Sequence, residues 1–358
     1  MNAFQCILQS GVDRGIVPCA CAAVLRRGGT PRFYSAGEAD GLAVSPHSFF
    51  DLASLTKVVC TTTVAMVLVD RRQLDLDTPV SAWLSGFEDA PSQLITPRLL
   101  LAHCAGFPAG KPYHRLFPDV NSVQALALVR ETPLEYAPGT ATVYSDLGFI
   151  VLGQILEKIG QASLAQLAEE LVFAPLNMHH TRFCPDVTQG HFVPTEEIAE
   201  APGTYWTGVV HDETARWLGG CAGHAGLFST AEDLARFGDF LLAGGAPLVF
   251  PAAFAQFTRP AGLVAGSTRC LGWDTPSPEL SAEVGASPGA FWHTGFTGTA
   301  LWCDPTVGMV VVLLTNAVHP HRSRKQQGYF PWRNQLLCAG NSKNCIYSDP
   351  PATSIREG

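Results

Sequence analysis

A serine and a lysine three residues apart, Ser54 and Lys57, are the residues of this chain whose types and spacing point most directly to chemistry. At the start of a helix, positions i and i+3 lie on one face, so the hydroxyl and the amine can meet. A serine hydroxyl becomes a good nucleophile only when a neighbouring group accepts its proton. A lysine can accept that proton if burial or nearby cations lower its pKa. The spacing therefore predicts an activated nucleophile, Ser54.

The alternative is a serine that caps the helix, followed by a solvated lysine. The chain has only five lysines, which makes a chance match less frequent than in a lysine-rich chain. The residues around the pair are also apolar, which favours a buried Lys57; they are Phe49, Phe50, Leu52, Val58 and Val59.

Tyr144, Ser145 and Asp146 stand immediately before a predicted helix over residues 147–159. A tyrosine beside a lysine can share a proton with it and serve as general base or acid. The alternative interpretation makes Asp146 the N-cap of the helix and Tyr144 a packing residue.

His293, Thr294 and Gly295 lie at the end of a predicted strand and are followed by Phe296. A glycine at such a place lets a substrate approach the backbone closely. The N–H groups of Phe296 and Ser54 are the two candidate donors to an oxyanion. A strand-edge glycine beside a turn is the structural alternative.

Taken in this order, S-x-x-K, Tyr-Ser-Asp and His-Thr-Gly, the three motifs resemble those of class C β-lactamases, serine DD-peptidases and family VIII carboxylesterases, whose signature is S-x-x-K, Y-x-N and K-T-G. The resemblance implies that Ser54, Lys57 and Tyr144 are catalytic, that Asp146 orients Lys57 and that His293 positions Tyr144 or the substrate. Thr294, Gly295 and Phe296 would complete the substrate-binding set.

The likeness extends over roughly residues 15 to 320. It includes the approach to the nucleophile at residues 50–57, the segment at 74–80, the loop at 99–108 with His103, and the glycine-rich stretch at 219–230. Three positions depart from the pattern: Asp146 stands for the usual Asn, His293 for the lysine of β-lactamases, and Ala105 for a serine. A histidine is neutral much of the time near pH 7, so His293 weakens the β-lactamase prediction and favours amide or ester hydrolysis.

The predicted fold class is α+β, with an antiparallel sheet flanked by helices and an inserted, mainly helical lobe. Apolar runs and turn residues predict a hairpin over residues 19–36 and another over 299–314, and helical patterns lie between them. We expect a single catalytic domain over 1–358, with an α/β lobe at about 1–75 and 229–335, a helical lobe at about 76–228, and a loose tail at about 336–358.

The composition of the chain limits the classes of partner and the cellular location that we expect. The net charge of −8 and the absence of a Lys/Arg block argue against nucleic acid. The longest apolar stretch, residues 58–69, is broken by three threonines and is too short to span a bilayer. Residues 1–17 do not resemble a signal peptide, and eleven scattered cysteines suit a reducing compartment, so we expect a cytoplasmic protein, or a periplasmic one if the N-terminus is truncated. No pattern specifies an oligomeric state.

The sequence offers two other candidate sites, a second serine motif and a metal site. Residues 285–289 match G-x-S-x-G, but Pro288 follows Ser287 and a strand comes next, whereas a nucleophile elbow needs a helix there. The histidine and cysteine pairs do not reach a zinc spacing, so we expect no metal and no cofactor. His211 and His224 are interpreted as buried, hydrogen-bonded histidines rather than substrate contacts.

The sequence thus predicts a serine hydrolase that acts through an acyl-enzyme on a small-molecule or peptide substrate. The predicted substrates are a peptidoglycan-derived or D-amino-acid peptide, or a small ester. β-Lactamase activity is one alternative, and a non-catalytic relative that binds a ligand in the same cleft is another.

Overall fold

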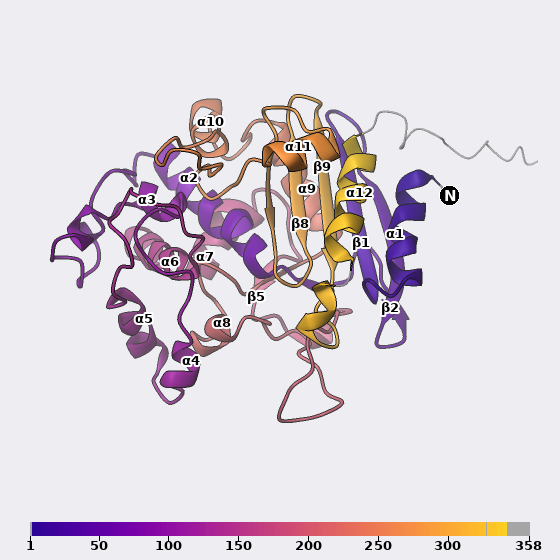
Figure 1. The fold of residues 1–358 in the computed structure, drawn as a ribbon, viewed down its shortest axis with the longest axis horizontal. Coiled ribbons are helices and arrows are strands. Elements are labelled where there is room, and N and C mark those ends of the chain that lie inside the picture. The colour runs from indigo at the N-terminus through magenta and orange to yellow at the C-terminus, as the bar shows by residue number, and fades with distance from the viewer. Residues whose placement is uncertain (1, 327, 342–358) are drawn as a thin grey trace, which may run out of the picture.

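The fold is built on a six-stranded antiparallel sheet, seen in a computed structural model that describes residues 2–326 and 328–341 (Figure 1). The strand order is β3-β2-β1-β9-β8-β7. The strands are β1 (Cys19–Arg26), β2 (Arg32–Ala39), β3 (Leu42–Ala43), β7 (Phe291–Thr294), β8 (Ala300–Asp304) and β9 (Met309–Thr315).

The two ends of the chain meet at the centre of this sheet. β1 pairs antiparallel with β9, with Ala20 opposite Thr315 and Arg26 opposite Met309. Every residue of β9 is buried and so are seven of the eight in β1, as expected for central strands covered on both faces. The sheet therefore cannot form until the last strand has returned to the first.

Helices cover both faces of the sheet. α1 (Ala3–Asp13) and α12 (Tyr329–Asn341) pack together on one face, and α9 (Ala231–Leu242) packs on β1 and β9. The two terminal helices approach closely at Gly11, where a Cβ atom would lie 2.4 Å from the ring of Trp332. In Figure 1, α1 and α12 lie on the right and the helical part of the chain on the left.

The middle of the chain is mainly helical and also carries a small sheet. Its strands run in the order β4-β6-β5, with β4 (Phe50–Asp51), β6 (Leu227–Ser229) and β5 (Arg182–Phe183). The remaining α-helices are α2 (Thr63–Asp70), α3 (Pro97–Leu101), α4 (Tyr113–Leu116), α5 (Ser122–Arg130), α6 (Asp146–Gly160), α7 (Leu164–Ala168), α8 (Glu213–Trp217), α10 (Pro251–Thr258) and α11 (Pro278–Val284). The 3₁₀ and π segments are η1 (Ala53–Leu55), η2 (Lys57–Thr62), η3 (Val80–Ala82), η4 (Ser92–Leu94), η5 (Glu169–Phe173), η6 (Val187–Gln189) and η7 (Arg322–Gln326).

The helix that carries the S-x-x-K pair is the central core helix. It runs as η1, η2 and α2, and within the described residues it is the one helix, Ala53–Asp70, whose length and composition would allow it to cross a membrane. It is 83% buried inside the protein, which is the environment of a core helix. Instead of one regular α-helix from Ser54, the structure has a 3₁₀ turn and a π-helical stretch before α2.

The predicted fold class is confirmed: antiparallel sheets are flanked by helices, with helical segments inserted between the strands from the two ends of the chain. Both predicted hairpins form, as β1–β2 and β8–β9. The bounds of the two lobes stay a prediction. The predicted loose tail begins inside α12, which extends to Asn341, and residues 342–358 lie outside the described residues.

Candidate active site

Ser54 lies in a tight turn whose backbone is held from several sides. The preceding residue, Ala53, has a φ of +46°, a left-handed conformation that is strained for a residue with a Cβ atom. The buried Asp51 carboxylate accepts hydrogen bonds from the N–H groups of Ala53 (2.8 Å) and His211 (2.6 Å). These two bonds fix the strained turn and with it the position of the Ser54 side chain.

Lys57 is buried completely, and its ammonium group has three acceptors. Its Nζ atom lies 3.1 Å from Ser54 Oγ, 2.6 Å from Asp146 Oδ1 and 3.2 Å from the carbonyl oxygen of His224. An ammonium group has three donors, so this arrangement satisfies all of them. The structure thus brings Ser54, Lys57 and Asp146 into direct contact.

A lysine accepts the proton of a serine only if its pKa is lowered, and the structure does not meet this condition for Lys57. Burial by itself lowers the pKa of Lys57, but the Asp146 carboxylate and the Tyr144 hydroxyl outweigh burial, and the pKa is raised. The pKa is raised because the side chain 2.6 Å away is an aspartate, which stabilises the charged form. Lys57 is therefore an ammonium group at neutral pH.

Tyr144 lies next to Lys57 and against a buried histidine. Lys57 Nζ is 4.8 Å from the centroid of the Tyr144 ring, and the centroid of the His103 ring lies 4.5 Å from the same centroid, with the two rings tilted by 35°. His103 Nδ1 accepts the Ser145 N–H at 3.0 Å, and burial keeps the pKa of His103 well below its usual value, so the ring stays neutral and able to accept. His103 thus positions the segment that carries Tyr144.

The alternative in which Asp146 caps helix α6 is wrong. Ser145 is the N-cap, and its Oγ accepts the Gly148 N–H at 3.3 Å and donates to the Pro108 carbonyl at 2.6 Å. The Asp146 carboxylate is thereby left for Lys57, which it meets in the ion pair described above.

The end of β7 is joined to the turn that carries Ser54. Thr297 Oγ1 donates to the carbonyl of Asp51 (2.8 Å), and Thr299 Oγ1 donates to that of Leu52 (2.9 Å). Gly295 lies in this contact, and a Cβ atom there would be 2.5 Å from the Leu52 carbonyl oxygen. Only glycine fits at this close approach of the two backbones.

His293 is buried beside Tyr144 and is uncharged. Its Nδ1 lies 2.9 Å from the Thr294 carbonyl, which can only accept, so Nδ1 carries the proton and Nε2 has a free lone pair. Burial, together with the charges of Lys57 and Arg269, holds the pKa of His293 well below its usual value. Its ring centroid is 6.0 Å from that of Tyr144. His293 does not supply the fixed positive charge of the lysine in K-T-G.

These residues line one cleft of about 380 Å³. Six of the eight predicted site residues lie in its wall: Ser54, Tyr144, His293, Thr294, Gly295 and Phe296. Lys57 and Asp146 lie behind Ser54. Phe296 is 49% exposed and offers its ring at the edge of the cleft. The roles of the Ser54 and Phe296 N–H groups as oxyanion donors stay a prediction.

The cleft also contains residues that the sequence analysis missed, namely Arg269, Asp274, Trp292, Lys325 and Phe330. The Arg269 guanidinium lies 5.2 Å from the Tyr144 ring and 3.3 Å from the Asp274 carboxylate. Lys325 Nζ donates to the carbonyls of Gly295 (3.2 Å) and Phe296 (2.7 Å), and burial lowers its pKa to about 8. Arg269 lies in a loop and Lys325 in the short 3₁₀ segment η7, neither of which carries a motif, so no spacing in the sequence points to them.

The side chains of the remaining candidates do not line the Ser54 cleft, although the backbones of His211 and His224 bind Asp51 and Lys57. His211 and His224 are buried and lie 2.9 Å from the carboxylates of Glu196 and Asp212. Ser287 follows the short helix α11, and its hydroxyl donates to Asp304. Within residues 2–326 and 328–341, no three His, Cys, Asp or Glu side chains cluster as a metal site would require.

The chain is similar to proteins of one known family. The family model described as Beta-lactamase matches residues 4–332. A protein of Salmonella typhimurium named "Putative D-alanyl-D-alanine carboxypeptidase" is 34% identical over 313 residues, which cover 78% of this chain and 71% of the relative.

Two solved structures share the fold over nearly the whole chain. EstCE1, described as a hydrolase with promiscuous acyltransferase activity, has a TM-score of 0.74 and 24% identity, covering 94% of this chain and 97% of its own. A Beta-Lactamase/D-Alanine Carboxypeptidase from Pseudomonas syringae has a TM-score of 0.72 and 20% identity, covering 97% and 100%. Since the family match spans most of the sequence and a curated relative is more than 30% identical over most of its length, this chain belongs to the beta-lactamase family.

Proposed function

We propose that this protein is a serine hydrolase that forms an acyl-enzyme on Ser54 and acts as a carboxypeptidase on peptides ending in a D-amino acid. The observation that carries the proposal is the contact between Ser54 Oγ and the buried Lys57 Nζ at 3.1 Å, in a cleft that also presents Tyr144. A ligand-binding module would not need an activated serine, and therefore would not need a buried lysine in contact with the serine hydroxyl.

The reaction begins with attack of Ser54 Oγ on the scissile carbonyl. Because Lys57 is an ammonium group at rest, the proton of Ser54 is accepted only after Lys57 and Tyr144 together have lost one proton. The Tyr144 oxygen then takes the proton from Ser54 and returns it to the leaving amine. The bond from Ser54 Oγ to the acyl carbon forms, the amide C–N bond breaks, and water later releases the acyl group.

Positive charge in the cleft supports a substrate with a free carboxylate. Arg269 and Lys325 line the cleft with Ser54, while Asp274 is its one carboxylate among the described lining residues. A guanidinium group binds a carboxylate through two parallel hydrogen bonds, which fixes the terminal residue of a peptide. The carboxypeptidase name of the 34% identical relative agrees with this substrate class.

Hydrolysis of a peptide ending in D-Ala-D-Ala, compared with its C-terminal amide, tests the proposal. We expect the free acid to be cleaved at least ten times more efficiently, and Arg269→Gln to lose roughly 10- to 100-fold in kcat/KM on the acid alone, the worth of a charged hydrogen bond. Arg259→Gln, an exposed arginine outside this cleft, is the matched control. Equal cleavage of acid and amide, or preference for a neutral short-chain ester, would replace the carboxypeptidase with an esterase.

A further inference from the structure

Lys325 contributes a cation to the Ser54 cleft, and its ammonium group binds the backbone on both sides of Phe296. Its Nζ atom donates to the carbonyl oxygen of Gly295 at 3.2 Å and to that of Phe296 at 2.7 Å. Burial lowers the pKa of Lys325 to about 8, which leaves the group charged at neutral pH. Two of the three ammonium donors therefore hold the two peptide groups that flank Phe296.

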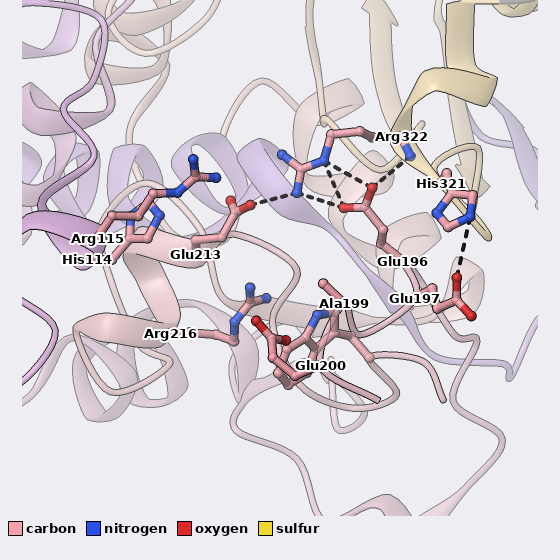
Figure 2. A pocket seen from close by; sticks show the side chains of 11 residues that line it. His114, Arg115, Glu196, Glu197, Ala199, Glu200, Glu213, Arg216, His321 and Arg322 are labelled. Carbon is pink, nitrogen blue, oxygen red and sulfur yellow. Dashed lines mark hydrogen bonds and ion pairs between the residues drawn. The ribbon is translucent and has the colours of Figure 1, made fainter. Parts of the chain in front are cut away.

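The segment that carries Lys325, η7, is itself fixed to the middle of the chain. Three residues before Lys325, Arg322 bridges the carboxylates of Glu196 and Glu213, each at 2.6 Å, and Figure 2 shows its guanidinium group between them. The backbone N–H of Arg322 also donates to Glu196 at 2.8 Å. The ammonium group is thus placed by the protein itself, as a preorganised group requires.

One of the two carbonyls belongs to the peptide group whose N–H is predicted to bind the oxyanion. The Gly295 carbonyl and the Phe296 N–H are the two ends of that group, and because the bond is trans they point in opposite directions. The Gly295 carbonyl accepts two hydrogen bonds, from Lys325 and from the Gly298 N–H at 3.1 Å. Among the residues that the structure describes, the Phe296 N–H has no acceptor, so it is available to a ligand.

Hydrogen bonds to a peptide carbonyl make the N–H of the same peptide group a stronger donor. The peptide bond is a resonance hybrid, and a donor at its oxygen favours the form with positive charge on the nitrogen. Linked hydrogen bonds polarise one another in this way, and a charged donor acts more strongly than a neutral one. The ammonium group on the Gly295 oxygen therefore increases the positive charge that the Phe296 N–H presents.

We propose that Lys325 is a positioning residue for the oxyanion, which strengthens and orients the Phe296 N–H through the peptide group that joins Gly295 to Phe296. The inference rests on the proposed acyl-enzyme function, in which this N–H stabilises the negative oxygen of the tetrahedral intermediate. The bond to the Phe296 carbonyl holds the next peptide group, so the N–H keeps its direction. Because acylation and deacylation both form an oxyanion, Lys325 acts in both steps.

Direct binding of a substrate carboxylate is the other role that the charge of Lys325 allows, since it lines the same cleft as Arg269. The two roles differ in the substrates that they affect. A carboxylate contact matters only for an acidic substrate, whereas an oxyanion forms on every ester and amide that Ser54 attacks.

Hydrolysis of a neutral, activated short-chain ester separates these roles. Lys325→Met removes the charge and the donors but keeps an unbranched side chain. We expect kcat to fall about 10- to 100-fold, less than the loss of about 10²- to 10³-fold on removal of an oxyanion donor itself. Lys325→Arg, which keeps a charged donor, should lose much less. Lys158→Met, at an exposed lysine outside the cleft, is the matched control.

Infrared spectra of the acyl-enzyme distinguish a weaker oxyanion contact from a general structural defect. The stretching frequency of an acyl carbonyl falls as the hydrogen bonds to its oxygen strengthen. With an isotopically labelled ester, the carbonyl band should therefore lie at higher frequency in Lys325→Met than in the wild type. If Lys325→Met does not fold, Lys325→Gln, which can donate but carries no charge, gives the same comparison of kcat and band.

Two results would overturn the inference and leave the hydrolase in place. One is wild-type kcat of Lys325→Met on the neutral ester with a loss confined to acidic substrates, which would make Lys325 a carboxylate contact. The other is a loss of kcat with an unchanged carbonyl band. Absence of any Ser54-dependent ester turnover in the wild type would instead overturn the proposed function, and the oxyanion role with it.

Discussion

At the scale of single residues, Asp146 favours the charged form of Lys57. It lies 2.6 Å from Lys57 Nζ, and its negative charge raises a pKa that burial would lower. The sequence pattern it departs from has an asparagine here, which is neutral. In the proposed reaction, we therefore expect the proton of Ser54 to be accepted at a higher pH than an asparagine would require.

Asp146→Asn is predicted to shift the rise of kcat/KM with pH toward lower pH. Removing a nearby negative charge lowers the pKa of Lys57 and of any group that shares its proton, so the reactive form appears earlier as pH increases. A pH profile of ester hydrolysis measures this shift. A profile that is unchanged, or that moves to higher pH, would show that Asp146 does not control the base.

Tyr144→Phe is predicted to lower kcat by about 10²- to 10⁴-fold, the usual contribution of a general base or acid. The ring contacts with His103 and Lys57 survive in phenylalanine, so the fold should be retained. Tyr205→Phe, a tyrosine outside the cleft, is the control. Steady-state kinetics checks the prediction, and a loss below tenfold would assign proton transfer to another group.

At the scale of elements, two segments that are distant in the chain must meet for the site to exist. Thr297 and Thr299, after β7, bind the carbonyls of Asp51 and Leu52, just before the turn of Ser54. The Asp51 carboxylate also accepts a hydrogen bond from the N–H of His211, in the middle of the chain. The position of Ser54 relative to Gly295 thus depends on these hydrogen bonds.

Gly295→Ala is predicted to lower kcat/KM by about 10²-fold or more. The new methyl group would lie 2.5 Å from the Leu52 carbonyl and 3.3 Å from Ala53 Cβ, so the turn must move, and a shift of about 1 Å at a reacting group can cost that much. Gly110→Ala, where the methyl group meets open space, is the control. The idea fails if Gly295→Ala retains wild-type kinetics.

Part of the candidate site could be predicted because its residues sit at junctions that leave a local signal. Ser54 begins a helix, Tyr144 precedes one, and His293 ends a strand, so each carries a recognisable spacing. Arg269, in a loop, and Lys325, in the short 3₁₀ segment η7, reach the same cleft from segments without a motif, and their placement depends on tertiary packing. The direction of the Lys57 pKa shift does not follow from the spacing of Ser54 and Lys57, because it depends on the charge of Asp146, 89 positions away in the chain.

At the scale of the whole molecule, ion pairs of η7 join the C-terminal part of the chain to its middle part. Arg322 bridges Glu196, in the loop before α8, and Glu213, in α8 itself. Burial opposes ionisation of Glu196, but hydrogen bonds from His211 and Arg322 outweigh it, and its pKa lies well below the usual value. Ionised Glu196 thus contributes to folding stability.

Arg322→Ala is predicted to destabilise the fold at neutral pH and to lose that effect in acid. A carboxyl group whose pKa is lowered on folding stabilises the folded state above its unfolded pKa, about 4.3, and the stabilisation is lost as pH falls toward the folded pKa. Denaturant unfolding of wild type and variant at pH 7 and pH 3 measures the difference, with Arg71→Ala as control. A difference that is equal at both pH values would contradict the linkage.

The general fold could be predicted from the sequence because each of its two hairpins consists of two strand-forming segments joined by turn residues. These hairpins supply β1, β2, β8 and β9. Helix α12 was not predicted, and the chain from about residue 336 was expected to be loose, but Leu336 and Leu337 are buried in a hydrophobic cluster with Phe4 and Leu8 of α1. Its apolar residues are interrupted by polar ones, and its stability comes from packing on α1 rather than from a regular local pattern.

The central claim is that Ser54 forms a covalent acyl-enzyme, and intact-protein mass tests it most directly. Wild type, Ser54→Ala and Ser287→Ala proteins would be incubated with a penicillin and, separately, with an activated short-chain ester. We predict a mass increase of one acyl group on wild type and on Ser287→Ala, and none on Ser54→Ala. An adduct that persists in Ser54→Ala, or that disappears in Ser287→Ala instead, would contradict the account.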